Sequence, residues 1–432
     1  MSATLAVSLL LSDYENDLAD GAVIVGDIYP ADPQGVTRTN ILIPCGDAPT
    51  PKEYEVPAGR YVVSARLPSG IVLSAEAEAR EGPPTPVRLN MVDSPYESHS
   101  WQYLLGNIER NRVYHDSSSE IPLAESRGSR SMVAPAPGPD GVIPESAPDQ
   151  SAVVTWVGDS TPPSWSFASM LALDKDRTGG PVAPEIARGP VGVLPRPEFG
   201  DAISPLYRFG PDGPVGAPAG PVGERQFLIV ETAMSTRLVT LPLPWGTSQV
   251  EVLVNLRQSP TGSAVAVAVR DPAVGAGLAY MAQGALDTAA QLFSDVEGLL
   301  YSKFENPIAA AAGAYVLLGT DHTEGETYWD PWLERLREGF TWLSDGAILR
   351  GMRLLRRARS TADRLTARDV LIEAFDRGIP YYTLGLAWLI DGLSAFPDDF
   401  ECVRRLDQAR RLSWLADMRE PFLILDLREG DA

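Results

Sequence analysis

The spacing of apolar residues changes once along this chain, and that change limits the possible folds more than any single motif does. Up to about residue 270, short apolar runs are separated by Gly, Pro and Asp, and apolar and polar residues alternate within the runs. This period of two is typical of strands with one buried face. From Pro272 onward the apolar residues recur every three or four positions, which is the spacing of helices. The sequence therefore predicts a multi-domain α+β protein.

A chain of 432 residues is too long for one ordinary core, so we expect several domains. The predicted order is a β-sandwich with a short C-terminal helix, a flexible linker, a second β-rich domain with a long Pro/Gly insert, and an α-helical domain. Their expected ranges are 1–115, 116–150, 151–271 and 272–432. The linker is placed at 116–150 because that segment is rich in Ser, Pro and Gly and poor in large apolar residues.

The clearest strand of the predicted sandwich runs from Arg60 to Leu67. Tyr61, Val63 and Ala65 lie on one face of it, and a turn at 68–70 leads into a second alternating run at 71–78, which predicts a hairpin. This hairpin and the residues before it resemble the core of prealbumin-like, or carboxypeptidase-regulatory-like, β-sandwich modules. The resemblance is carried by Val56-Pro57-Ala58-Gly59-Arg60-Tyr61-Val62-Val63, followed by a leucine, Pro68 and Gly70. Such modules are usually spacers or binding platforms.

The rest of the chain shows a run of shorter candidate elements. Strands of the second β-rich domain are expected at Ala152–Val157, Ser166–Leu173, Gln226–Glu231, Leu238–Leu243, Val250–Leu256 and Ala264–Val269. One apolar helix face spans Leu278 to Leu299, and Pro307 opens a second helix. Further helices are expected at Asp330–Phe340, Ser344–Ala358, Thr366–Arg377, Pro380–Phe396 and Asp398–Met418. The tail Pro421–Leu427 is expected to be a last strand or an extended arm. Short breaks between these helices resemble the stacked helical hairpins of tetratricopeptide (TPR)-like arrays.

A second resemblance concerns the last third of the chain. It is carried by three strings, Ser302-Lys303-Phe304-Glu305-Asn306-Pro307, Trp342-Leu343-Ser344-Asp345-Gly346-Ala347 and Phe375-Asp376-Arg377-Gly378-Ile379-Pro380. These are similar to helical regions of prokaryotic conflict-system proteins that accompany caspase-like or CHAT peptidases. The resemblance implies an adaptor, an inhibitor or a cleavable target of such a peptidase in bacterial defence.

The charge balance excludes one class of partner. Asp and Glu outnumber Lys and Arg by 57 to 36, and the net charge of −21 repels phosphate backbones. We therefore expect no nucleic-acid partner. No apolar stretch approaches the roughly 20 residues of a membrane span, and the N-terminal apolar run lacks the positive region of a signal peptide. With only two cysteines, the sequence predicts a cytoplasmic protein without a membrane partner. It does not predict the oligomeric state.

No catalytic or cofactor motif is present. We therefore expect no cofactor and favour a protein that is not an enzyme. Cys45 and Cys402 lack the flanking residues of a cysteine nucleophile paired with His99, His115 or His322. The segment Asp321–Glu326 offers oxygen and imidazole ligands, but without the spacing of a known metal loop it favours a solvated acidic loop. No Walker loop or G-x-G-x-x-G occurs.

Two groups of arginines are the candidate interaction sites. One patch comprises Arg350, Arg353, Arg356, Arg357 and Arg364. It is either a solvent face paired with Asp363, Asp369 and Glu373, or a docking surface for an acidic partner or phosphate, because guanidinium groups bind carboxylates and phosphates with two hydrogen bonds.

The second group is Arg127 and Arg130 in the predicted linker, where we expect proteases to cut first. Such a loop is either an inert tether or a dedicated regulatory cleavage site. Together these observations predict a non-enzymatic interaction or regulatory protein with a protein partner, a peptidase among the candidates. The alternatives are an unrecognised hydrolase with its site in the second β-rich domain, and a structural component built from sandwich modules.

Overall fold

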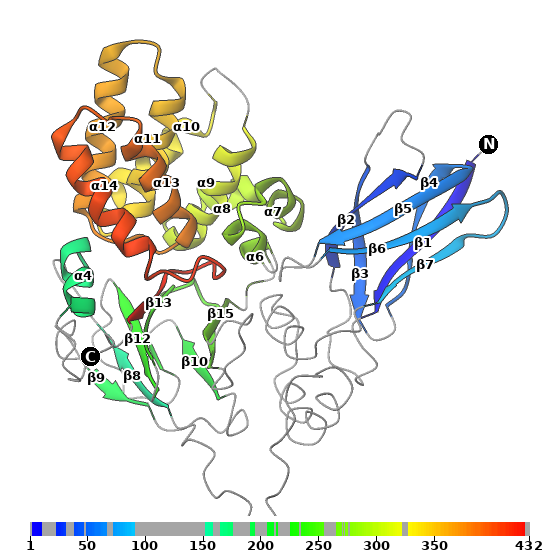
Figure 1. Cartoon of the computed structure of the whole chain (residues 1–432), viewed down its shortest axis with the longest axis horizontal. Coiled ribbons are helices and arrows are strands. Elements are labelled where there is room, and N and C mark those ends of the chain that lie inside the picture. Colours follow the sequence, from blue (N-terminus) through cyan, green and yellow to red (C-terminus); the bar gives the residue numbers. More distant parts are fainter. Residues whose placement is uncertain are drawn as a thin grey trace, which may run out of the picture. The chain divides into compact units, whose positions relative to one another are not determined.

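The computed structural model describes residues 2–10, 23–31, 39–46, 49–66, 72–90, 152–158, 165–175, 191–194, 205–210, 213–214, 225–232, 235–254, 265–269, 271, 273–274, 277–321 and 327–427. These residues form two compact units, one over 2–90 and one over 152–427. The predicted short helix before residue 115 and the predicted linker, with Arg127 and Arg130, lie outside the described residues. The multi-domain α+β fold is confirmed (Figure 1).

The first unit is built entirely from strands in its described part. They are β1 (Ser2–Leu10), β2 (Val23–Pro30), β3 (Thr39–Gly46), β4 (Lys52–Pro57), β5 (Gly59–Arg66), β6 (Val72–Ala79) and β7 (Thr85–Asn90). The strand order is β4-β1-β3-β2-β5-β6, with β7 also paired to β1. Most of β3 pairs with β2, whereas its last two residues pair with β1, so β3 joins the two parts of the sheet.

Alternation of apolar residues explains why these strands form. Leu5, Val7 and Leu9 of β1 are buried, and so are Tyr61, Val63 and Ala65 of β5. The hairpin β5–β6 pairs Gly59 with Ala79 at its open end, and the predicted inward face of β5 is confirmed. The resemblance to prealbumin-like modules stays a prediction.

The second unit begins with two antiparallel sheets. One has the order β16-β13-β12-β8-β9 and the other β11-β10-β14-β15. The first sheet contains β8 (Val153–Val157), β9 (Val191–Val193), β12 (Gln226–Glu231), β13 (Thr236–Leu241) and β16 (Ile424–Leu427). The second contains β10 (Leu206–Gly210), β11 (Gly213–Pro214), β14 (Val250–Val254) and β15 (Val265–Val269).

Helices follow the sheets in the second unit. In the described residues they are α6 (Gly277–Ala282), α7 (Leu286–Leu292), α8 (Val296–Tyr301), α9 (Pro307–Thr320), α10 (Asp330–Gly339), α11 (Ser344–Arg357), α12 (Thr361–Asp376), α13 (Thr383–Ser394) and α14 (Phe400–Ser413). Helix α9 begins at Pro307 with the Asn306 side chain accepting the Ala309 N–H, and α12 begins with a capping box made by Ser360 and Asp363. In Figure 1 these helices gather on one side of the strands. No described helix is both long and apolar enough to cross a membrane.

Two sequence predictions were wrong in detail. The run Ser166–Leu173 is not a strand but lies largely in a helix, α4 (Phe167–Lys175), because the Ser166 hydroxyl accepts the Ser169 N–H at its start. The apolar face from Leu278 to Leu299 belongs to three short helices rather than one. Gly284, at φ +72°, lies just after the first of these helices, α6, where the chain turns. Asp295 caps the start of the third, α8.

Strands and helices of the second unit share one core. Strand β16 follows the last helix and pairs with β13, so the chain returns to the sheet after all the helices. A buried polar network adds a second link: Arg225, before β12, donates to the carbonyls of Ile379 and Pro380 at 2.6 and 2.8 Å. The predicted boundary at residue 271 therefore does not separate two compact units.

Asp345 of α11 lies in the same network. It accepts the Tyr315 hydroxyl and the Tyr381 N–H, each at 2.8 Å, and the Tyr382 N–H at 3.4 Å. Burial raises the pKa of Asp345, and hydrogen bonds from Tyr381 and Tyr315 partly oppose that rise.

Candidate partner-binding site

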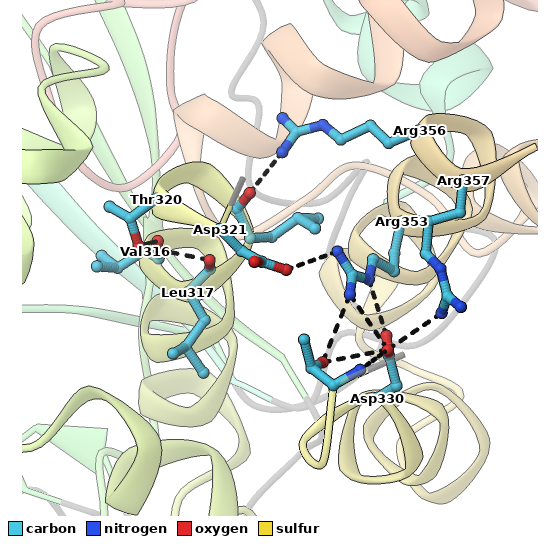
Figure 2. Close-up of polar contacts among 10 residues, drawn as sticks. Val316, Leu317, Thr320, Asp321, Asp330, Arg353, Arg356 and Arg357 are labelled. Carbon is cyan, nitrogen blue, oxygen red and sulfur yellow. Dashed lines mark hydrogen bonds and ion pairs between the residues drawn. The ribbon is translucent and has the colours of Figure 1, made fainter. Parts of the chain in front are cut away.

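The predicted arginine patch lies on α11 and at the start of α12, but its members have different surroundings. Arg353 is only 2% exposed and forms the centre of a buried ion-pair cluster (Figure 2). It donates to Asp321 at 2.7 Å and through Nε to Asp330 at 2.9 Å, and its guanidinium lies 4.7 Å from the Trp329 ring centre. Arg353 is therefore excluded from any docking surface in this fold.

Asp330 is positioned by the beginning of α10. Its carboxylate accepts the Thr327 N–H and hydroxyl, in addition to Arg353 and Arg357. Burial alone would raise the pKa of Asp330, but the hydrogen bonds from Arg353 and Thr327 outweigh burial and lower it. The cluster thus holds α10 against α11 with both charges fixed.

An open groove of about 700 Å³ lies beside this cluster. Arg350 and Arg357 of α11 line it, and both are paired with carboxylates of α10: the Arg350 Nε lies 2.5 Å from Glu334, and Arg357 lies 3.1 Å from Asp330. The remaining lining residues are Thr327, Pro331, Leu354, Arg359, Asp363 and Thr366. The groove has a mixed polar and apolar lining, and these ion pairs hold Arg350 and Arg357 in place.

Arg356 and Arg364 differ from the other arginines of the patch because backbone carbonyls, not carboxylates, hold them. Arg356 donates to the Leu318 carbonyl and lies 4.9 Å from the Trp388 ring centre. Arg364 donates to the Ala395 carbonyl at 3.0 Å and lies 5.5 Å from the Phe396 ring centre. Within the described part of the chain, neither guanidinium forms a hydrogen bond or ion pair with a carboxylate. Burial and the charge of Arg353 lower the pKa of Arg356, and the charge of Asp321 only partly opposes them.

The acidic residues predicted to neutralise the patch have other roles. Asp363 caps α12, and Glu373 pairs with Arg337 and Arg377. Asp369 pairs with Arg368, beside the patch. Neutralising carboxylates come instead from Asp321, Asp330 and Glu334. Only the position of Asp330 had a sequence signal, an acid before a proline at a helix start.

The candidate cysteines are buried, and Asp321 of the predicted acidic loop takes part in an ion pair. Burial raises the pKa of Cys45 to about 12 and that of Cys402 to about 11, so both thiols are protonated at neutral pH. Asp321 pairs with Arg353, whereas the rest of the predicted acidic loop, His322 to Glu326, lies outside the described residues. His99 and His115 do too.

The arginine patch lies in the part of the chain that matches a family model. Residues 276–423 match the family model described as the Y4kD C-terminal domain. The match covers helices α6–α14 and does not include the sheets that precede them. No curated protein and no solved structure matches the chain. The resemblance to peptidase-associated conflict-system proteins stays a prediction.

Proposed function

We propose that this chain is a non-enzymatic interaction protein whose helical part binds an acidic segment of a partner protein. The observation that carries the proposal is that Arg356 and Arg364 are two positive charges that form no ion pair in the described structure. In a chain of net charge −21, such charges are a local contrast that attracts acidic groups over short distances.

The positions of these arginines support binding more than a flexible basic patch would. Each guanidinium is fixed by one hydrogen bond to a carbonyl and by an aromatic ring, so little side-chain entropy is lost when a carboxylate arrives. A guanidinium has five N–H donors, so donors remain for a carboxylate.

The class of partner follows from the second resemblance in the sequence. If the helical part is related to proteins that accompany caspase-like or CHAT peptidases, the acidic segment belongs to such a peptidase or to a protein that it controls. The chain is then an adaptor, an inhibitor or a target of cleavage. Gene neighbourhood tests this step independently, because an adjacent peptidase gene supports it and an isolated gene argues against it.

Charge neutralisation tests the docking surface directly. We expect the full chain to bind a fluorescein-labelled octaglutamate peptide in a fluorescence anisotropy titration, and the double variant Arg356→Gln, Arg364→Gln to bind it about five- to thirtyfold more weakly. The difference should shrink at high salt because exposed charges are then screened.

A matched variant controls for general loss of positive charge. Arg404 and Arg411 of α14 are partly exposed, with side chains 47% and 44% accessible, and each lies near a carboxylate of its own helix. The variant Arg404→Gln, Arg411→Gln should leave binding unchanged. Equal binding by wild type and by Arg356→Gln, Arg364→Gln would refute the proposal, and so would a complete lack of binding by wild type.

A further inference from the structure

A second surface of the helical part combines aromatic side chains with two positive charges. It is formed by Tyr301 at the end of α8, by Lys303 and Phe304 in the following turn, and by Trp332 and Arg335 of α10. We call these five residues the aromatic–cation surface. Phe304 is 75% exposed, and its ring lies 5.9 Å from that of Phe340. Exposed aromatic residues beside arginine are typical of interface hot spots.

Lys303 is the unusual member of this surface. It is fully buried, and its Nζ has no hydrogen-bond partner. The Nζ lies 4.0 Å from the Trp332 ring centre and 5.1 Å from that of Phe304. Burial lowers the pKa of Lys303, and the charge of Arg335 lowers it further. The amine therefore has aromatic rings but no hydrogen-bond acceptor beside it, an arrangement that costs stability.

Arg335 lies on the same tryptophan. Its guanidinium is 5.4 Å from the Trp332 ring centre, and Tyr301 packs against the same ring at 4.7 Å. In the described structure, neither Lys303 nor Arg335 forms an ion pair. A nearby carboxylate, Glu297, accepts the Tyr328 hydroxyl instead. The surface therefore has two positive charges that no carboxylate neutralises.

We infer that the aromatic–cation surface binds a segment of a partner protein in which a carboxylate stands beside an aromatic side chain. The aromatic side chain packs on Phe304 and Trp332. The carboxylate pairs with the exposed Arg335, and the charge of the buried Lys303 attracts it without direct contact. This surface differs from the groove. Asp330 and Glu334 of α10 line the groove, whereas Trp332 contacts Lys303 in the turn after α8 and Arg335 lies over the Trp332 ring. The inference does not depend on the proposed function of Arg356 and Arg364.

A peptide library identifies the chemistry that the surface selects. We expect a random-peptide phage library, selected on the immobilised full chain, to yield sequences with Asp or Glu next to Phe, Tyr or Trp. Selected peptides should bind the double variant Phe304→Ala, Arg335→Gln about tenfold more weakly or worse. They should bind equally to wild type, to Phe400→Ala and to Arg356→Gln, Arg364→Gln. Phe400 is the matched control because it is 76% exposed but lies on α14.

Lys303→Met separates a binding role from a structural one. Methionine keeps the apolar length but removes the buried charge, so we expect the midpoint of urea unfolding to stay the same or rise while the selected peptides bind more weakly. A lower midpoint with unchanged binding would show that Lys303 only packs, and the inference would fail. It would fail as well if the selected peptides lacked acidic residues, or if Phe304→Ala, Arg335→Gln converted a dimer of this chain to a monomer, since the occupant would then be a second copy.

Discussion

Removal of the Asp345 carboxylate should lower the free energy of unfolding of the second unit more than a surface substitution does. In Asp345→Ala the Tyr315 hydroxyl and the Tyr381 and Tyr382 N–H groups lose their acceptor in a fully buried site. Each buried donor left without a partner costs about 1–3 kcal/mol. Two of these hydrogen bonds are short and one is long, so we expect a loss of about 3–5 kcal/mol in the free energy of unfolding.

Urea unfolding followed by tryptophan fluorescence measures this loss in the correct unit, because every tryptophan except Trp101 lies in the second unit. Tyr315→Phe provides the matched comparison, since it removes one of the three donors. The double variant Asp345→Ala, Tyr315→Phe should lose less than the sum of the two single losses, because the hydroxyl is no longer left without a partner. A loss below about 1 kcal/mol for Asp345→Ala, or a purely additive cycle, would refute this account of the network.

The pH dependence gives an independent check. Because burial raises the pKa of Asp345 above its ordinary value of 3.8, the folded state binds this proton more tightly than the unfolded state does. The stability gained from that proton is present below the ordinary pKa and is lost as pH rises through the raised pKa. The unfolding free energy of wild type minus that of Asp345→Asn should therefore decrease as pH rises over this range, because only wild type loses the proton. An increase would contradict the direction of the shift.

Two further predictions concern other parts of the chain. A Cβ at Gly385 would lie 2.4 Å from the Tyr315 hydroxyl oxygen and 2.7 Å from Asp345 Oδ1, so Gly385→Ala should cost about 1–3 kcal/mol in urea unfolding, whereas Gly339→Ala, which meets nothing within 4 Å, should not. Limited trypsin digestion should cut at Arg127 and Arg130 first, as mass spectrometry of the fragments would show, and digestion of the helical part before these sites would contradict that expectation.

Local sequence patterns were sufficient to predict most of the elements. Alternation marked the β5–β6 hairpin, and a proline at a helix start marked α9, because these signals depend on neighbours within a few residues. The strand predicted at Ser166–Leu173 failed because a short apolar run has no period that distinguishes strand from helix. The predicted boundary at 271 failed to separate two units because the core joins elements distant in sequence.

The candidate site was predictable in composition but not in arrangement. The helical spacing placed four of the arginines on one helix, α11, whereas Arg364 fell before the next predicted helix and lies instead in the first turn of α12. Nothing local indicated that Arg353 would be buried against Asp321 and Asp330. Asp321 and Asp330 both lie more than twenty positions before Arg353, and Asp321 lies at the end of a different helix, α9. The aromatic–cation surface was missed for the same reason. The sequence contains Lys303 and Trp332 but does not indicate that they meet, because only the packing of α10 on the turn after α8 brings them together.

The return of β16 to β13 has a consequence for synthesis on the ribosome. The two strands pair across all the intervening helices, so the first sheet of the second unit keeps an open edge at β13 until the residues at 424–427 have emerged. An unpaired edge is a template for pairing with other chains, and contacts between distant residues form slowly. A nascent chain stalled after α12 has emerged would therefore expose the unpaired edge of β13 to other chains, although it already contained both arginine-bearing helices, α11 and α12.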